Sequence, residues 1–234
     1  QGGSYLLERV AMDLHDACEN GNLELIRNNL TKRTDGKNKS GRKWSVHSKD
    51  ETGRTALHAA CFGAQLDVVR LLMGQPVTVD TSEDACLIDW GNGQTVHARV
   101  QEEGQKLEPD ACVNREQLKA GSTVYRDMYG NTPLITSCYV GSKGDNDFEI
   151  AKILIEAGDH VNATKPADNM SALAWAAFHG DLKVVRLLLS RNNGGSRANP
   201  VVLTKPDNQF PIDLAGMRAM MMRKEGLKDD PTNS

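Results

Sequence analysis

The chain has 234 residues, 25% of them charged and 5% aromatic, with a formal net charge of −3. This balance argues against a strongly basic nucleic-acid binder and against a disordered acidic chain. No run of 18 apolar residues occurs, so no membrane-spanning helix is predicted. The first residues lack the basic, apolar and small-residue order of a secretory signal, which is typical of an intracellular protein, cytoplasmic or nuclear.

The sequence offers no motif of an enzyme or a metal site. Five cysteines occur without a CxxC pair and without histidines at ligand spacing, which argues against a disulfide framework and a structural zinc site. The GxSxG, HExxH, GxxxxGK[ST] and GxGxxG motifs are also missing from the sequence. We therefore predict no catalytic residue, no metal ligand, no cofactor and no small-molecule substrate.

Similar stretches follow one another along the chain. Each starts at an apolar residue that we call the anchor: Leu14, Leu57, Leu134, Leu173 and Ile212. Three and four positions after each anchor come two small residues, which let neighbouring helices pack closely. A second apolar stripe with the spacing of a broadly buried helix follows in the first four copies. Each unit is therefore predicted to consist of a helix, a tight turn and a second helix.

Turn-forming residues precede the anchors. A residue that tolerates positive φ lies four positions before each of the last four anchors: Gly53, Gly130, Asn169 and Asn208. A hydroxyl side chain then provides the expected helix N-cap in three units: Thr55, Thr132 and Ser171. Pro133 stands in the first helical turn, where its missing N–H costs nothing. These units resemble the ankyrin repeat, most closely in TALHAA at 55–60 and GDHVNA at 158–163.

The resemblance implies a mainly α fold, an ankyrin-repeat solenoid of stacked helix–turn–helix units with a small insertion that contains a β-hairpin. It also implies that His15 and His58, which directly follow anchors, hydrogen-bond between neighbouring units. In chain order we predict a tag remnant (1–4), an N-terminal capping ankyrin unit (5–30), a basic loop (31–49), an ankyrin unit (50–74), a β-rich insertion (75–126), an ankyrin unit (127–163), an ankyrin unit and loop (164–205), a C-terminal capping unit (206–226) and a disordered tail (227–234).

The insertions lengthen the spacing between anchors beyond the family's period of about 33 residues. The loop 31–49 is rich in lysine and arginine and could bind nucleic acid or an anionic surface, although a solvated loop explains it as well. In the insertion 75–126, two β-type runs flank Gly91–Gly93 and predict a hairpin. We expect outer strands at 77–79 and 122–125, and a degenerate repeat is the alternative. Cys86 and Cys112 could pair there under oxidation.

Two shorter segments complete the prediction. Residues 142–147 are expected to form a solvated turn, because the acidic spacing of a calcium loop is incomplete. The last helix has an apolar side that we interpret as the end of the stack, with a second protein packing on its methionines as the alternative: Ile212, Leu214, Met217, Met220 and Met221.

The resemblance implies function through a surface. Ankyrin proteins meet partners on their concave face, where this chain has Arg54, Phe62, Met128, Tyr129, Tyr139, Met170, Phe178 and His179. We predict a non-catalytic, monomeric module that binds a protein or peptide there, and assign Trp175 to the stack itself. The alternative is a regulatory domain of a larger enzyme or channel chain. Asn162 also resembles the asparagine hydroxylated in ankyrin proteins, although a bridge across its turn explains it as well.

Overall fold

The structure is a computed structural model that describes residues 13–30, 45–75, 87–89, 95–97, 113, 116, 118, 125–141, 145–190, 197–215, 217, 220 and 221. The predictions for the tag remnant, for most of the basic loop, for Gly91–Gly93, for Cys86 and Cys112, and for the tail lie outside these residues.

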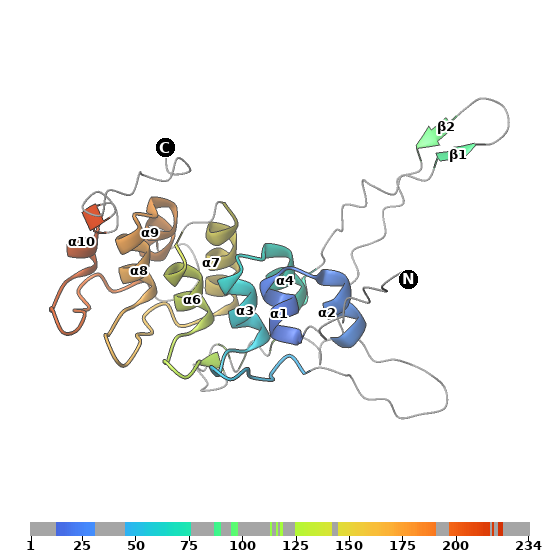
Figure 1. Ribbon diagram of the computed structural model, residues 1–234. Helices are drawn as coiled ribbons and strands as arrows, with labels where there is room; N and C mark the ends of the chain where they lie inside the picture. The colour runs from blue at the N-terminus through green and yellow to red at the C-terminus, as the bar shows by residue number, and fades with distance from the viewer. Residues whose placement is uncertain are drawn as a thin grey trace, which may run out of the picture.

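The described helices form consecutive pairs. They are α1 (Leu14–Glu19) with α2 (Leu23–Leu30), α3 (Ala56–Phe62) with α4 (Leu66–Leu72), α6 (Pro133–Tyr139) with α7 (Asp145–Ala157), and α8 (Ala172–His179) with α9 (Leu182–Leu189), followed by the short α10 (Pro211–Leu214). The first helix of each unit packs on the next, α1 on α3, α3 on α6, α6 on α8 and α8 on α10. Figure 1 shows the resulting elongated stack, which follows chain order from α1 to α10. The predicted mainly α solenoid is confirmed.

The turns form where the sequence predicts them. The four residues placed before the anchors all have positive φ: Gly53 (75°), Gly130 (83°), Asn169 (59°) and Asn208 (51°). The hydroxyl of Thr132 accepts a hydrogen bond from the Ile135 N–H at 3.3 Å, and that of Ser171 accepts one from the Ala174 N–H at 3.2 Å. We call the hairpin turns 49–55, 126–132, 164–171 and 204–210 the fingers.

The insertion leaves the stack uninterrupted. Because α3 contacts α6 directly, the described residues place no further unit between them, which favours an insertion over a degenerate repeat. Strands β1 (Leu87–Asp89) and β2 (Thr95–His97) pair antiparallel with Ile88 opposite Val96, which confirms the hairpin. Both strands lie apart from the stacked helices (Figure 1).

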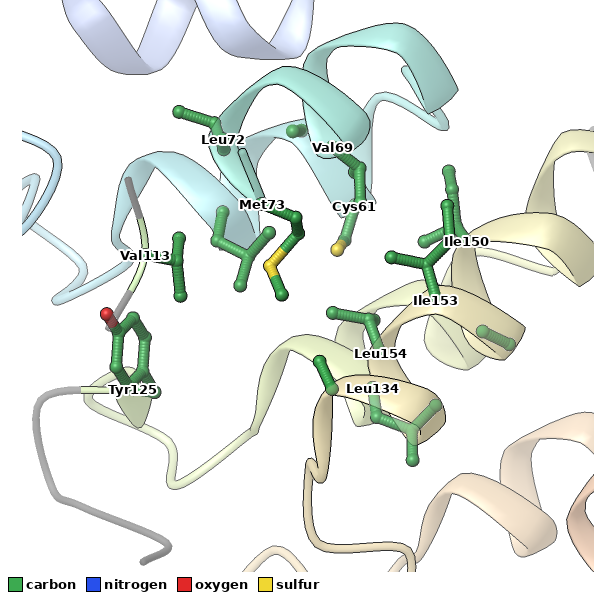
Figure 2. Close-up of a cluster of buried hydrophobic side chains, with 14 of the residues drawn as sticks. Cys61, Val69, Leu72, Met73, Val113, Tyr125, Leu134, Ile150, Ile153 and Leu154 are labelled. Atoms are coloured by element: carbon green, nitrogen blue, oxygen red, sulfur yellow. The ribbon is translucent and has the colours of Figure 1, made fainter. Parts of the chain in front are cut away.

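The end of the insertion returns to the core. Tyr125, the described residue of the expected outer strand 122–125, lies in a helical turn and is 2% exposed, so the strand prediction is wrong there. Its hydroxyl lies 3.3 Å from Nδ1 of His47. The N–H of Val113 donates to the Leu72 carbonyl at 2.8 Å, and Figure 2 shows Val113 and Tyr125 on the Met73 side of the cluster. These side chains fill the space beside α4 that the insertion would otherwise leave open.

Two segments expected to be solvated are partly buried. Val46 is 3% exposed, and Lys49, which pairs with Thr55 in a β-bridge, donates from Nζ to the Arg126 carbonyl at 2.9 Å. Lys49 therefore belongs to the first finger and Val46 to the core, instead of a solvated basic loop. In 142–147, α7 already begins at Asp145 and Asp147 is 4% exposed, so the turn is shorter than predicted.

The anchors are buried except at the end of the stack. Leu14, Leu57, Leu134 and Leu173 are 0–3% exposed, whereas Ile212 is 77% exposed. The prediction that Ile212 is a buried anchor like the others is therefore wrong, and Met220 (66%) and Met221 (47%) are exposed as well. Among the described helices, α10 packs on the first helix of the preceding unit, α8. This contact buries Leu214 of α10 and leaves Ile212 exposed.

Four positions after each of the first three anchors, the second of the two small residues is a cysteine. Cys18, Cys61 and Cys138 are buried and form no disulfide. Burial raises the pKa of the Cys18 and Cys138 thiols to about 12 and that of Cys61 well above its ordinary value. These thiols pack as small hydrophobic groups in the core.

Candidate protein-interaction surface

The first helices present a row of aromatic side chains. Phe62, Tyr139 and Phe178 each lie five residues after their anchor, at the C-terminal end of α3, α6 and α8. Tyr139 is 49% exposed, and the other two are half-buried. Equivalent positions on stacked helices lie on one face, so the three units contribute to one surface, which we call the first-helix face.

Four rings from α6 and α8 form an aromatic cluster on this face: Tyr139, Trp175, Phe178 and His179. Trp175 lies at its centre, edge-to-face with Tyr139 at 4.8 Å between ring centroids and with Phe178 at 5.8 Å. The ring of His179 stacks on Trp175 at 6.0 Å, and its Nε2 lies 2.8 Å from the Tyr139 carbonyl oxygen. Such pairs add about 0.5–1.5 kcal/mol each beyond their buried area. The cluster is therefore held in one arrangement, and Trp175 belongs both to the stack and to the surface.

The finger of the third unit adds two exposed side chains, Met128 (64%) and Tyr129 (54%). The carboxylate of Asp127 accepts from the Tyr129 N–H at 2.9 Å and the Asn131 N–H at 2.8 Å, which fixes the turn. Nζ of Lys165 lies 6.0 Å from the centroid of the Tyr129 ring, a cation–π arrangement. Both predicted residues are thus presented by an ordered turn.

Arg54 has its own partners within the chain. Its Nε donates to Asp50 Oδ2 at 2.8 Å, its Nη1 lies 3.5 Å from Glu19 Oε2, and its guanidinium carbon lies 5.4 Å from the Phe62 ring centroid. Although burial acts to raise the pKa of Asp50, hydrogen bonds from Thr52 and Arg54 outweigh it and lower the pKa to about 2. Arg54 therefore joins the first two units and covers part of Phe62.

One predicted surface residue is not on the surface. Met170 is 9% exposed and packs with Ala174 and Leu214, so its assignment to the partner-binding face is wrong. It directly precedes the N-cap Ser171, a position whose side chain folds back onto the first turn of the helix. Helix α10 then covers it.

The two histidines that follow anchors have the predicted role of linking units. His58 Nδ1 accepts from the Thr55 N–H at 3.3 Å, so Nε2 carries the proton and donates to the Asn131 carbonyl of the next unit at 3.1 Å. Burial lowers the pKa of His58 to about 4, which keeps the ring neutral. His15 Nε2 lies 3.1 Å from the Ser48 carbonyl oxygen in the same way.

Asn162 joins its turn to the segment that follows α9, through both ends of its amide, instead of bridging its own turn. Nδ2 donates to the Arg197 carbonyl at 3.0 Å, and Oδ1 accepts from the Asn199 N–H at 2.6 Å. These bonds account for the residue structurally, and its hydroxylation stays a prediction.

Within the described part of the chain, no three or more His, Cys, Asp or Glu side chains are grouped as metal ligands would be. The helices of the described ranges are also too short or too polar to cross a bilayer.

The family follows from the repeat pattern and from a direct match. The sequence model of the protein family described as ankyrin repeats (three copies) matches residues 14–96 and 109–200 of this chain. The chain belongs to the ankyrin-repeat family. Ankyrin repeats are protein-interaction modules and generally not catalytic.

Several curated proteins are similar to parts of this ankyrin chain. A putative E3 ubiquitin-protein ligase, XBAT35 of Arabidopsis thaliana, is 37% identical over 111 residues, which is 45% of this chain and 22% of the relative. The DNA replication inhibitor plutonium of Drosophila melanogaster is 39% identical over 67 residues, 29% of this chain and 35% of the relative. Osteoclast-stimulating factor 1 of Monopterus albus is 36% identical over 69 residues, which is 30% of this chain and 28% of the relative. The chain spans between 22% and 35% of the length of these three relatives.

Proposed function

We propose that the first-helix face binds a protein or peptide segment through the aromatic cluster and the exposed finger residues Met128 and Tyr129. The observation that carries this proposal is the exposure of Tyr139, 49%, on top of a fixed aromatic cluster. Folding alone does not require an exposed ring there, because the anchors and cysteines already fill the core. Large aromatic and methionine side chains contribute about 2 kcal/mol or more each when a partner buries them centrally.

The test is affinity capture from a cell lysate with the full chain, followed by binding measurements with the purified partner. The test variant is Met128→Ala with Tyr139→Ala, which shortens two exposed side chains. Leu182→Ala is the matched control, because Leu182 is 66% exposed but lies on the second helix of its unit, α9. We expect a partner that binds the wild type and the control and is lost from the test variant while circular dichroism shows that variant to be folded, because losing the Tyr139–Trp175 pair costs only about 0.5–1.5 kcal/mol. Equal binding to all three proteins would contradict the proposal.

A second proposal places this segment inside a larger chain as its recognition part. It is favoured by the partial matches to XBAT35 and to a second putative E3 ubiquitin-protein ligase of Arabidopsis thaliana, XBAT34, which is 40% identical over 78 residues. In this proposal the repeats select a target and the activity belongs to other domains. A partner captured through the first-helix face that becomes ubiquitinated only when the full-length protein is present would support it.

A further inference from the structure

Hydrogen bonds join neighbouring fingers at two junctions of the stack. Between the second and third units, the N–H of Met128 donates to the Thr52 carbonyl at 2.9 Å. Between the fourth and fifth units, the N–H of Lys205 donates to the Asp168 carbonyl at 2.7 Å. Side chains add further hydrogen bonds at the same two junctions: Lys49 Nζ to the Arg126 carbonyl at 2.9 Å, His58 Nε2 to the Asn131 carbonyl at 3.1 Å, and Asn169 Nδ2 to the Leu203 carbonyl at 2.6 Å.

The junction between the third and fourth units lacks such bonds. Within the described part of the chain, no hydrogen bond joins the finger 126–132 to the finger 164–171. The two fingers touch through Gly130 and Pro166, since a Cβ on Gly130 would lie 2.5 Å from Cδ of the proline. Nζ of Lys165 also lies 6.0 Å from the centroid of the Tyr129 ring, at the outer limit of a cation–π contact. Neither contact has the directional preference of a hydrogen bond.

A proline accounts for the missing backbone bond. Pro166 stands seven positions before its anchor, as Lys205 does in the next unit. Tyr129 stands five positions before its anchor, as Asp168 does. Lys205 donates its N–H to the Asp168 carbonyl, but the nitrogen of a proline carries no hydrogen. The equivalent bond to the Tyr129 carbonyl therefore cannot form.

The histidine link is missing at the same junction. His58 directly follows its anchor and donates from Nε2 to the Asn131 carbonyl of the next finger. The third unit has Ile135 at this position, and its side chain offers no donor to the next finger. The fourth unit has Ala174 there, but it keeps the backbone bond that Lys205 makes. Among these three junctions, the one between the third and fourth units has thus lost both kinds of finger link.

Away from the fingers, the same two units are firmly joined. At the C-terminal ends of α6 and α8, the Tyr139 ring packs edge-to-face on Trp175 at 4.8 Å between centroids, and Nε2 of His179 lies 2.8 Å from the Tyr139 carbonyl oxygen. Asn162 bonds to the segment that follows α9. Regions with few hydrogen bonds open most easily, so this junction is fixed at the aromatic cluster and free to open at the fingers.

We infer that the stack bends between the third and fourth units: the fingers 126–132 and 164–171 separate, and the aromatic cluster is the pivot. The finger residues Met128 and Tyr129 then move relative to Phe178 of the fourth unit, so bending changes the shape of the face that we propose binds a partner. The bend goes beyond that proposed function and does not depend on it, because it follows from contacts within the chain.

The experiment measures distances between two spin labels on the full chain by pulsed electron paramagnetic resonance. The test pair, Met128 and Asp207, spans the third-to-fourth junction, whereas the control pair, Asp16 and Met128, spans only earlier junctions. All three positions are exposed, and labels on a keto amino acid introduced there leave the native cysteines unchanged. Each pair spans two unit spacings, about 16–20 Å. We expect a broader distance distribution for the test pair than for the control pair.

Two variants restore the missing links. Pro166→Ala returns the N–H at an exposed position, and Ile135→His returns the histidine at a buried position where His58 shows that the ring fits. Each variant should narrow the distribution of the test pair to the width of the control pair. The new amide at position 166 should also be protected from hydrogen exchange. Pro200→Ala is the matched control, because it removes an exposed proline outside the fingers and should leave both distributions unchanged.

The possible results are distinct. A test-pair distribution as narrow as that of the control pair would overturn the bend. A broad distribution that neither Pro166→Ala nor Ile135→His narrows, or an unprotected amide at position 166, would show that the finger links do not control it and would overturn the inference as well. No partner takes part in these measurements, so either result leaves the proposed binding surface standing, and a failure of the capture experiment leaves the bend standing.

Discussion

The substitution Gly63→Ala tests whether the close contact between the first two units determines how stably they are folded. Its backbone conformation (φ −77°, ψ −4°) is one that alanine adopts readily. Because alanine leaves the unfolded chain less conformational freedom than glycine, this conformation alone predicts that Gly63→Ala raises the free energy of unfolding by about 0.4–1 kcal/mol. However, a Cβ there would overlap the carbonyl oxygen of Glu19 and lie 2.9 Å from its carbonyl carbon and 3.0 Å from its Cα. These are backbone atoms at the end of α1, which cannot move unless α1 separates from α3. We expect a net loss of about 3 kcal/mol.

The assay is urea unfolding followed by far-ultraviolet circular dichroism, with amide hydrogen exchange to locate the loss. Amides of α1 and α2 should lose protection first, because each repeat depends on its neighbours. Gly180→Ala is the control: its Cβ would meet nothing within 4 Å, but its φ of 77° is unfavourable for alanine and should cost about 1 kcal/mol. If Gly63→Ala is as stable as the wild type, or more stable, the argument from close approach is refuted.

The remaining predictions concern pH, a turn and the end of the stack. Burial lowers the pKa of His58 from 6.5 to about 4, so between these pH values the imidazole is protonated in the unfolded chain but not in the folded one. The free energy of unfolding should therefore fall by about 3 kcal/mol as the pH decreases from 6.5 to 4. Burial raises the pKa of Asp159 to about 6, so this residue adds stability as the pH falls and masks part of the effect of His58. Urea unfolding of the wild type and of His58→Gln at several pH values separates the two, and the variant should lose less stability in acid. Ala64 has a φ of 54°, at a position where other units have glycine. The substitution Ala64→Gly should therefore raise the free energy of unfolding by about 1 kcal/mol and the melting temperature by about 2–4 °C. An unchanged or lower melting temperature would contradict this prediction. Ile212→Ala should cost less than about 0.5 kcal/mol, whereas Leu173→Ala at the equivalent anchor should cost about 2–5 kcal/mol in the same assay; similar costs would show that Ile212 is covered.

The local parts of the fold could be predicted from the sequence. Gly130 and Asn169 identify turns because few residues tolerate positive φ, and Thr132 before Pro133 identifies a helix start because of the chemistry of the N-cap. The two small positions after each anchor followed from recurrence across units, whereas the linking role of His58 followed from the resemblance to ankyrin repeats. All of these features depend on contacts within one unit or between adjacent units.

The candidate site could be predicted only in part. Tyr129 and Tyr139 are exposed, as expected, because their positions in the unit alone place them on the first-helix face. Met170 occupies a similar finger position and is buried, because Leu214 of the following unit happens to cover it.

The sequence by itself therefore determined the unit, its turns, its caps and its repetition, because these depend on residue chemistry at short and regular spacing. The tertiary structure decided which side chains each unit covers on its neighbours. Ile212 occupies an anchor position like Leu173, yet it is exposed because the packing of α10 on α8 covers Leu214 instead. Tyr125 has the pattern of a strand, yet it is buried in the core, where its hydroxyl lies 3.3 Å from Nδ1 of His47, a residue 78 positions away in the chain.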